Sequence, residues 1–318
     1  MRPLVPTPHR RPLGVIAVAA VSATLAGCGG SYATPGSPSA TPTATSASAP
    51  SAANPSGQPM PPSELPGWHR VFSDNFEQTV PLGQFPAAVA AKWGRSYPDG
   101  LKDTSKQGTY EPTKVVSIGD GVLNIHVHTA DGIHMVAALL PTIAGAQGSY
   151  GGLLYGRYSL RLRADPASGY KLSVLLWPDS EKWPKDGEID FPETALGTPI
   201  IGFVHHQNGR SAVDQVGFYT DQTLNRWHTA TITWLPTGIT FQLDGNVIGT
   251  AYARIPNTPM HMIIQAETRL RGGVMTPSEE SNIQFDWLTI ATPACNRSMS
   301  VDPTTAACTP ATLPALPS

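Results

Sequence analysis

The chain has 318 residues, of which 14% are charged, and its formal net charge is -2. Nucleic acids and anionic membrane surfaces attract proteins that cluster Lys and Arg, so this balance gives no reason to expect either of them as a partner. A neutral substrate is compatible with the charge. The 32 prolines and 30 glycines are unevenly spread, which indicates a linker rather than disorder of the whole chain.

The N-terminus has the pattern of an export signal. Three arginines precede an apolar run from Leu13 to Ala26, which is short for a membrane span and suits a secretory signal. The run ends in Leu25-Ala26-Gly27-Cys28, which resembles a bacterial lipobox. We therefore predict a lipoprotein signal over residues 1–27 and a lipid on Cys28, with an ordinary secretory signal as the alternative. The protein is expected to be exported, either anchored to the cell membrane or extracellular.

A linker is predicted over residues 28–63. From Gly29 to about Pro62 the sequence is almost wholly Ser, Ala, Thr, Pro and Gly, and it contains no charged side chain. Such a segment buries too little apolar surface to offset the entropy lost on ordering. We predict a disordered tether, followed by a folded domain over residues 64–292.

Two cysteines remain in the predicted irregular tail, residues 293–318. If Cys28 carries lipid, Cys295 and Cys308 are an even pair in an oxidising compartment. A bond between them would close a loop of about 14 residues and stabilise the fold by roughly 3 kcal/mol on the chain-entropy model. We predict a disulfide between Cys295 and Cys308.

The folded domain has strand patterns and poor helix signals. Apolar and β-branched runs bounded by turn residues recur along it, which predicts one large all-β sandwich. The predicted strands are 115–127 with a turn at Gly119-Asp120-Gly121, 135–140, 154–162, 172–176, 200–205, 227–234, 239–243, 247–251, 261–266 and 283–290. Between residues 154 and 163, polar and apolar residues alternate, which predicts a sheet with one face exposed to water.

The stretch Trp183 to Glu193 carries three acids, Glu188, Asp190 and Glu193. In a regular strand Glu188 and Asp190 share a face, whereas Glu193 falls on the other one. A β-bulge would bring Glu193 back, and Pro192 is a residue that sheets accept at bulges. Crowded carboxylates repel each other and cost stability, so three acids on one face indicate an active site.

This stretch resembles the Glu-x-Asp-x-x-Glu signature of glycoside hydrolase family 16 in its bulged, laminarinase-like form. Phe72 to Phe76 is similar to the opening strand of that family, and Tyr155 to Tyr158 and Leu175 to Pro178 are similar to strands leading to its site. Arg226 to Gly245 is similar to its His, Trp and Asp-Gly hairpin. The resemblance covers essentially the whole domain and implies an all-β jelly-roll sandwich of two antiparallel sheets with a concave substrate cleft.

The resemblance also implies catalytic roles. Glu188 corresponds to the nucleophile, Glu193 to the general acid/base, and Asp190 to the carboxylate that orients the nucleophile and helps to keep the proton on Glu193. A retaining glycosidase needs two carboxyl groups about 5 to 5.5 Å apart, one ionised and one protonated. The implied protein is a glycoside hydrolase that acts by double displacement.

Four further residues are predicted to bind the sugar: Trp177, Trp183, His205 and Trp93. The two tryptophans beside the acids could stack on sugar rings, with core packing as the alternative. Trp93 lies in a polar, Gly-rich loop and is a weaker candidate for the far end of the cleft. His205 and His206 must point to opposite faces of a strand, so one of them is expected to lie near the acids.

The expected function is that of a retaining endo-glycosidase that hydrolyses internal β-1,3 linkages of a glucan. The alternatives are a transglycosylase that remodels an envelope glycan and a non-catalytic carbohydrate-binding jelly roll. No cofactor and no metal site is predicted, although the resemblance allows a structural calcium ion. The expected partners are a polysaccharide substrate and, through the lipid anchor only, a membrane. We expect a monomer and no nucleic-acid binding.

Two segments depart from the family pattern. Phe191-Pro192 stands where aliphatic residues or Met are often found, and Gln265-Ala266-Glu267 stands where a more apolar strand is expected. Both lie where binding of the sugar chain could differ from that of relatives.

Overall fold

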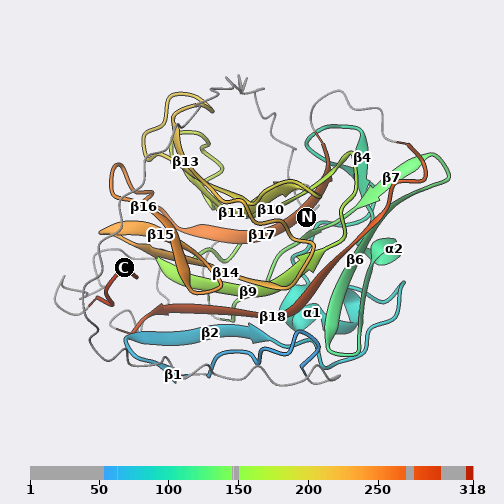
Figure 1. Ribbon diagram of the computed structural model, residues 1–318, viewed down its shortest axis with the longest axis horizontal. Coiled ribbons are helices and arrows are strands. Elements are labelled where there is room, and N and C mark those ends of the chain that lie inside the picture. The colour runs from blue at the N-terminus through green and yellow to red at the C-terminus, as the bar shows by residue number, and fades with distance from the viewer. Residues whose placement is uncertain are drawn as a thin grey trace, which may run out of the picture.

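The computed structural model describes residues 54–62, 64–144, 146, 150–269, 276–294 and 313–317. Their strands form two sheets, one of 12 and one of six strands, which lie over one another with the six-stranded sheet uppermost in Figure 1. Stacked rings join the sheets, since Phe191 of the smaller sheet lies 4.9 Å from Phe241 of the larger one. A core of buried apolar side chains fills the space between them. The predicted all-β sandwich is confirmed.

The larger sheet, called the outer sheet below, has a central path of nine strands. In order these are β16 (Asn246–Ala251), β15 (Gly238–Leu243), β14 (His228–Leu235), β9 (Gly156–Ala164), β18 (Ser281–Pro293), β6 (Val122–Ala130), β7 (Ile133–Val136), β4 (Gly108–Tyr110) and β3 (Leu101–Lys102). Beside this path, β1 (Glu64–Leu65) pairs with β2 (Trp68–Asp74), β2 pairs with β18, and β5 (Val116–Gly119) pairs with β6. All these pairs are antiparallel except that of β4 with β7.

The smaller sheet, called the site sheet below, is antiparallel throughout. Its order is β13 (Gln215–Tyr219), β12 (Ile201–His205), β11 (Glu188–Ala195), β10 (Tyr170–Pro178), β17 (Met260–Thr268) and β8 (Ala138–Leu139). The helices in the described residues are short: η1 (Ala87–Val89), α1 (Ala90–Trp93) and α2 (Pro112–Val115). None of them is long and apolar enough to cross a membrane.

Every strand predicted from the sequence is present, with ends that differ by a few residues. The short strands β1, β3 and β4 and the five-residue strand β13 were not predicted. In β13, four residues are only partly buried, Tyr219 is exposed and Gly217 lies in the middle, and glycine weakens a strand pattern because it has no side chain to pack. The signal was therefore too weak to distinguish β13 from a loop.

The predicted linker is wrong for residues 54–62, which lie on the outer sheet. The Ser56 amide donates a hydrogen bond to Asp286 Oδ2 at 3.2 Å, and Trp287 Nε1 donates to the Gln58 carbonyl at 3.0 Å. Arg161 Nε donates to Ser56 Oγ at 3.2 Å. These contacts use polar groups of the segment, whereas the prediction counted only its apolar side chains. The folded domain thus begins about ten residues earlier than expected.

The same segment explains a second difference. Residues Ser159 and Arg161 of β9 were predicted to face water, but they are only 5% and 8% exposed. Ser56 covers Arg161, and Ser159 Oγ lies 2.9 Å from Thr231 Oγ1 of the neighbouring strand. Polar and apolar residues do alternate along β9, but the segment 54–62 and the neighbouring strand cover part of the polar face.

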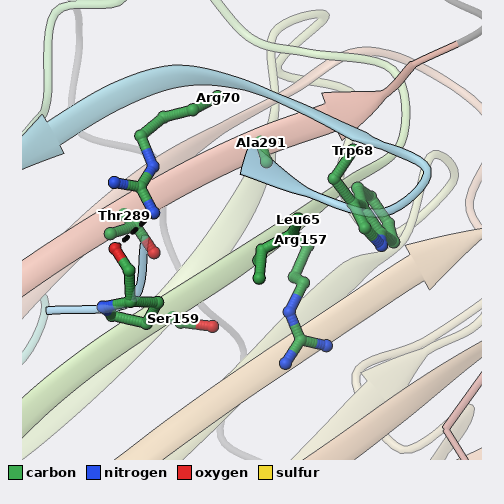
Figure 2. Close-up of a pocket in the computed structure, with 8 residues that line it drawn as sticks. Leu65, Trp68, Arg70, Arg157, Ser159, Thr289 and Ala291 are labelled. Carbon is green, nitrogen blue, oxygen red and sulfur yellow. Dashed lines mark hydrogen bonds between the residues drawn. The ribbon is translucent and has the colours of Figure 1, made fainter. Parts of the chain in front are cut away.

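A small pocket of about 90 Å³ lies where this N-terminal part meets the outer sheet (Figure 2). It is lined by Pro61, Leu65, Trp68, Arg70, Arg157, Ser159, Thr289 and Ala291. Arg70 reaches across to the Pro61 carbonyl, to which its Nη2 donates at 2.9 Å. The pocket contains none of the three acids and lies on the opposite sheet from them, so we do not assign it to the predicted chemistry.

Removing residues 54–62 is expected to destabilise the domain. A chain that begins at Asn54 should be more stable than one that begins at Glu64, by about 2 kcal/mol or more, because the shorter chain loses at least four hydrogen bonds and exposes Trp287. Urea unfolding of both chains measures the difference. Equal free energies of unfolding would show that the segment adds nothing to the domain.

Several predictions lie outside the described residues. These are the signal over 1–27 with Cys28, most of the linker, and the disulfide between Cys295 and Cys308. Of the predicted tail, residues 293–294 and 313–317 are described; Pro293 is the last residue of β18, and the others lie in no helix or strand. Leu313 and Leu316 pack against Trp68, Leu235 and Ala291.

Candidate active site

Strand β11 places the three acids. Ile189 and Phe191 are fully buried and face the core, so Glu188 and Asp190 face away from it. The start of the strand is fixed by Gly187, whose φ is +78° and where a Cβ would lie 2.7 Å from the His205 carbonyl oxygen. No other residue type fits that position without strain.

The register of β11 shifts between Asp190 and Glu193. Toward β12, Asp190 pairs with Phe203 and Glu193 pairs with Ile201, so two residues of β11 stand opposite Gly202 alone. The pairing with β10 shifts at the same place. The extra residue returns Glu193 to the face of Glu188 and Asp190, and the irregularity predicted at Pro192 is confirmed.

Strand β10 lies next to β11 and contributes side chains to the same face of the site sheet as the acids. Its residues Leu172 and Val174 are fully buried in the core. Lys171, Ser173 and Trp177 alternate with them and therefore share the face of the acids. Ser173, which pairs with Glu193, donates from its Oγ to Asp190 Oδ1 at 3.4 Å.

His205 of β12 lies at the centre of the site. Its Nε2 is 3.8 Å from Glu188 Oε2 and 3.7 Å from Asp190 Oδ2. One donor atom from each of these three residues lies within 4.8 Å of the other two. The prediction that one of the two histidines lies near the acids is confirmed for His205. His206 instead contacts Asp214 at 3.1 Å.

The acids differ in exposure. Glu188 and Asp190 are each only 2% exposed, whereas the Glu193 side chain is 27% exposed. Glu193 is thus the acid that solvent, or the oxygen of a bound sugar, reaches most readily. This asymmetry suits a site in which one carboxyl group exchanges protons while another is held fixed.

Trp177 and Trp183 lie beside the acids as an aromatic pair. Their rings are stacked at 5.9 Å with an interplanar angle of 17°, and Trp183 meets His205 edge to face at 5.8 Å. Both indoles are partly exposed. Trp177 is also tied to the following loop, because its Nε1 donates to Glu181 Oε2 at 3.2 Å. Their role in sugar binding stays a prediction.

The prediction that Trp93 binds sugar is wrong. Its side chain is 0% exposed, and its ring packs against Phe72, Phe76 and Phe85. Nε1 donates to Asp74 Oδ2 at 2.8 Å. The polar, Gly-rich sequence around Trp93 suggested an exposed loop, but a short helix turns the indole inward.

Three polar residues near the acids were not predicted: Lys171, Ser173 and Glu267. All three are buried. The signal was present in part, since Gln265-Ala266-Glu267 departs from the apolar pattern expected of that strand. The pairing of Lys171 with Glu267 across β10 and β17 leaves no sign in the local sequence, because the two residues are far apart in the chain.

A two-sheet β-sandwich with three carboxyl groups on the outward face of one sheet, beside stacked tryptophans, is the architecture of a glycoside hydrolase. The family model described as "Glycosyl hydrolases family 16" matches residues 109–288, which include the whole of the site just described. The chain belongs to glycosyl hydrolase family 16.

Similar proteins agree with this assignment. A beta-glucanase of Bacillus subtilis (strain 168) is 28% identical over 109 residues, which are 33% of this chain and 43% of the relative. The match thus spans less than half of that relative's length.

Solved structures show the same fold at low identity. The laminarinase from Rhodothermus marinus has a TM-score of 0.55 and 22% identity, covering 71% of this chain and 97% of its own. The LamA catalytic domain from Zobellia galactanivorans has a TM-score of 0.53 and 19% identity, covering 70% and 96%. An endo-acting O-glycanase of the human gut microbiota, linked to mucin breakdown, has a TM-score of 0.57 and 19% identity, covering 74% and 94%. The fold is therefore shared by enzymes that act on different glycans.

Proposed function

We propose that the protein is a retaining endo-glycosidase that hydrolyses internal β-1,3 linkages of a glucan. The observation that carries the proposal is the register shift of β11, which gathers Glu188, Asp190 and Glu193 on one face of the site sheet. A regular strand would leave Glu193 in the core. Family membership and the match to a beta-glucanase support the same reaction class.

In the first step Glu188 attacks the anomeric carbon, while Glu193 donates its proton to the leaving oxygen. The glycosidic bond breaks, the leaving chain departs as an alcohol, and a glycosyl ester forms on Glu188. Asp190 and His205, both within 4.8 Å of Glu188, orient the nucleophile. The buried, hydrogen-bonded setting of Asp190 suits this role, because it fixes the side chain.

In the second step a water molecule attacks the glycosyl ester. Glu193, now ionised, accepts a proton from that water and is restored to its acidic form, and Glu188 leaves as a carboxylate. Two inversions give net retention of the anomeric configuration. Because the carboxyl groups supply both nucleophile and proton, we propose that the reaction needs no metal, and EDTA-treated enzyme should keep full activity.

One experiment tests the function directly. The domain from Asn54 onward is incubated with laminarin, mixed-linkage glucan, galactan and a mucin-type glycan, and the products are sized and followed by NMR. We expect oligosaccharides from laminarin whose newly formed reducing ends are first seen as the β anomer. Longer products would favour transglycosylation. Binding without product release from any glycan would overturn the proposal in favour of a binding module.

Trp183 is expected to contribute to binding rather than to the chemical step. A Trp183→Ala variant should raise KM about 5-fold with little change in kcat, because a stacked aromatic contact contributes about 1 kcal/mol. Trp227→Ala is the matched control, since that partly exposed indole lies under Arg163 of the outer sheet, 5.0 Å from its guanidinium. Steady-state kinetics on laminarin measure both. An unchanged KM for Trp183→Ala would remove this residue from the binding surface.

We also propose that the protein is exported and held at the membrane by a lipid on Cys28. The lipobox-like sequence supports this proposal. The position of residues 54–62 also supports it, because they lie on the outer sheet, on the side of the sandwich opposite the acids. A chain tethered from that side would leave the site sheet facing the surrounding polysaccharide.

A further inference from the structure

Beside the three acids, the site sheet contains a buried pair of opposite charges, Lys171 of β10 and Glu267 of β17. The two residues are direct neighbours across the strands, and Lys171 Nζ lies 3.2 Å from Glu267 Oε2. The Lys171 side chain is 8% exposed and that of Glu267 is 0% exposed. Charges buried this deeply are retained in proteins only when they are paired and hydrogen-bonded.

Glu267 also accepts hydrogen bonds from neutral donors at both of its oxygens. Tyr110 donates to its Oε1 at 2.5 Å, and Thr104 donates from Oγ1 to its Oε2 at 2.7 Å and from its amide to Oε1 at 3.2 Å. Burial, and then the charge of Glu267, raise the pKa of Tyr110 well above its usual value. Tyr110 therefore stays protonated and remains a donor that holds the Glu267 carboxyl group in place.

Lys171 also reaches the acid that we assign as acid/base. Its Nζ lies 3.9 Å from Glu193 Oε1, on the same face of the sheet. If the ion pair had only a structural role, Lys171 would need to contact Glu267 alone and not Glu193. Here the ammonium lies between a fully buried carboxylate and the most exposed of the three site acids, so any change in its charge balance acts on Glu193.

The position of Lys171 matters because Glu193 must change its protonation state during the proposed reaction. A general acid must hold its proton in the first step, but a lone cation beside it favours the ionised form. Glu267 offsets that cation. Lys171 and Glu267 together therefore add a net charge close to zero beside Glu193, in addition to Glu188 and Asp190 of β11 and His205 of β12, while the ammonium still fixes the direction of its carboxyl group.

We propose that Lys171 is a positioning residue for Glu193 and that Glu267 is its counter-charge, and that this pair sets the pH range in which Glu193 works as an acid. The proposal deepens the proposed function and rests on it for the role of Glu193. Neither Lys171 nor Glu267 needs to touch the sugar.

The test is the alkaline limb of the activity–pH profile on laminarin. Glu267→Gln keeps the shape, and its amide oxygen can still accept from Tyr110 and from the Thr104 amide, but it leaves the charge of Lys171 without its offset. We expect the alkaline midpoint to fall by about one pH unit, the usual size of the effect of one nearby charge. The double variant Lys171→Met/Glu267→Gln removes both charges, so its midpoint should rise again above that of Glu267→Gln.

Glu111→Gln is the matched control. Glu111 is likewise buried and paired with a lysine, at 3.0 Å from Lys114 Nζ, but it has no contact with Lys171. Its pH profile should match the wild type. Superimposable profiles for wild type, Glu267→Gln and the double variant, all folded by circular dichroism, would overturn the proposal.

A second readout separates this proposal from the function itself. Carbon-13 NMR of protein labelled at the Glu carboxyl carbons, with Glu193 assigned by a Glu193→Gln variant, follows the titration of Glu193 without any substrate. A shifted titration in Glu267→Gln supports the charge pairing even if no glucan is hydrolysed. An unshifted titration contradicts it even in an active enzyme.

Discussion

A Glu188→Ala variant is expected to hydrolyse laminarin about 10⁴-fold more slowly than the wild type, or worse, because removal of a covalent nucleophile abolishes the double-displacement route. Its melting temperature should stay equal or rise. Glu188 lies near Asp190 in a buried cluster, and deleting one of two crowded carboxylates relieves repulsion that the fold otherwise tolerates for function.

Azide distinguishes the roles of the two acids. In Glu188→Ala the small anion can occupy the vacated space and attack the anomeric carbon of an activated β-glucoside, which gives the α-glycosyl azide after one inversion. In Glu193→Ala, azide instead replaces water in the second step and gives the β-glycosyl azide. NMR of the products reads the configuration.

Glu77→Ala serves as the control for both variants, since Glu77 is exposed and contacts only Asn75 among the hydrogen bonds described. It should hydrolyse laminarin at the wild-type rate. Substantial turnover by Glu188→Ala, or the same azide anomer from both site variants, would contradict the assignment of nucleophile and acid/base.

Trp93→Ala is expected to destabilise the domain by about 3 to 5 kcal/mol, the usual cost of removing a buried aromatic side chain. The indole is 0% exposed, and its ring centroid lies 5.7 Å from that of Phe72 and 6.0 Å from that of Phe76. Its loss also leaves a buried oxygen of Asp74 without its 2.8 Å donor. Urea unfolding monitored by circular dichroism measures the change.

Kinetics below the unfolding temperature complete this test. Folded Trp93→Ala should bind laminarin with the wild-type KM, in contrast to Trp183→Ala, which should raise KM and leave the stability nearly unchanged. Trp93→Phe, which keeps most of the volume but not the donor, should fall between wild type and Trp93→Ala in stability. A raised KM with unchanged stability for Trp93→Ala would restore this residue to the sugar-binding surface.

The sequence predicted the sandwich and the position of the acids because both depend on local rules. Alternation of side chains along a strand is strict, so the parity of Glu188, Asp190 and Glu193 could be counted without knowledge of the fold. Turn signals such as Asp244-Gly245 also depend on local rules, and they marked where strands end. The hairpin that joins β15 and β16 turns at these two residues.

The errors arose where distant segments meet. Whether Trp93 faces water depends on Phe72, Phe76 and Phe85, which reach it through tertiary packing. Residues 54–62 look like a linker by composition, but the partners of Ser56 lie in strands more than 100 residues away. The pairing of Lys171 with Glu267 likewise required the order of the strands, which no local pattern contains.

The shift in β11 makes the site depend on the number of residues rather than only on their identity. Thr194, the next residue after Glu193, is 2% exposed and pairs with Leu172 of the core face. If the residues from Glu188 to Thr194 formed a regular ladder without the shift, Glu193 would turn into the apolar core and Thr194 would face the sugar. Deleting either Phe191 or Pro192 removes the extra residue, so a regular ladder would then keep Glu193 on the face of Glu188 and Asp190. Among related chains, one residue between Asp190 and Glu193 in a regular strand, or two residues in a bulged strand, therefore both place the three acids on one face.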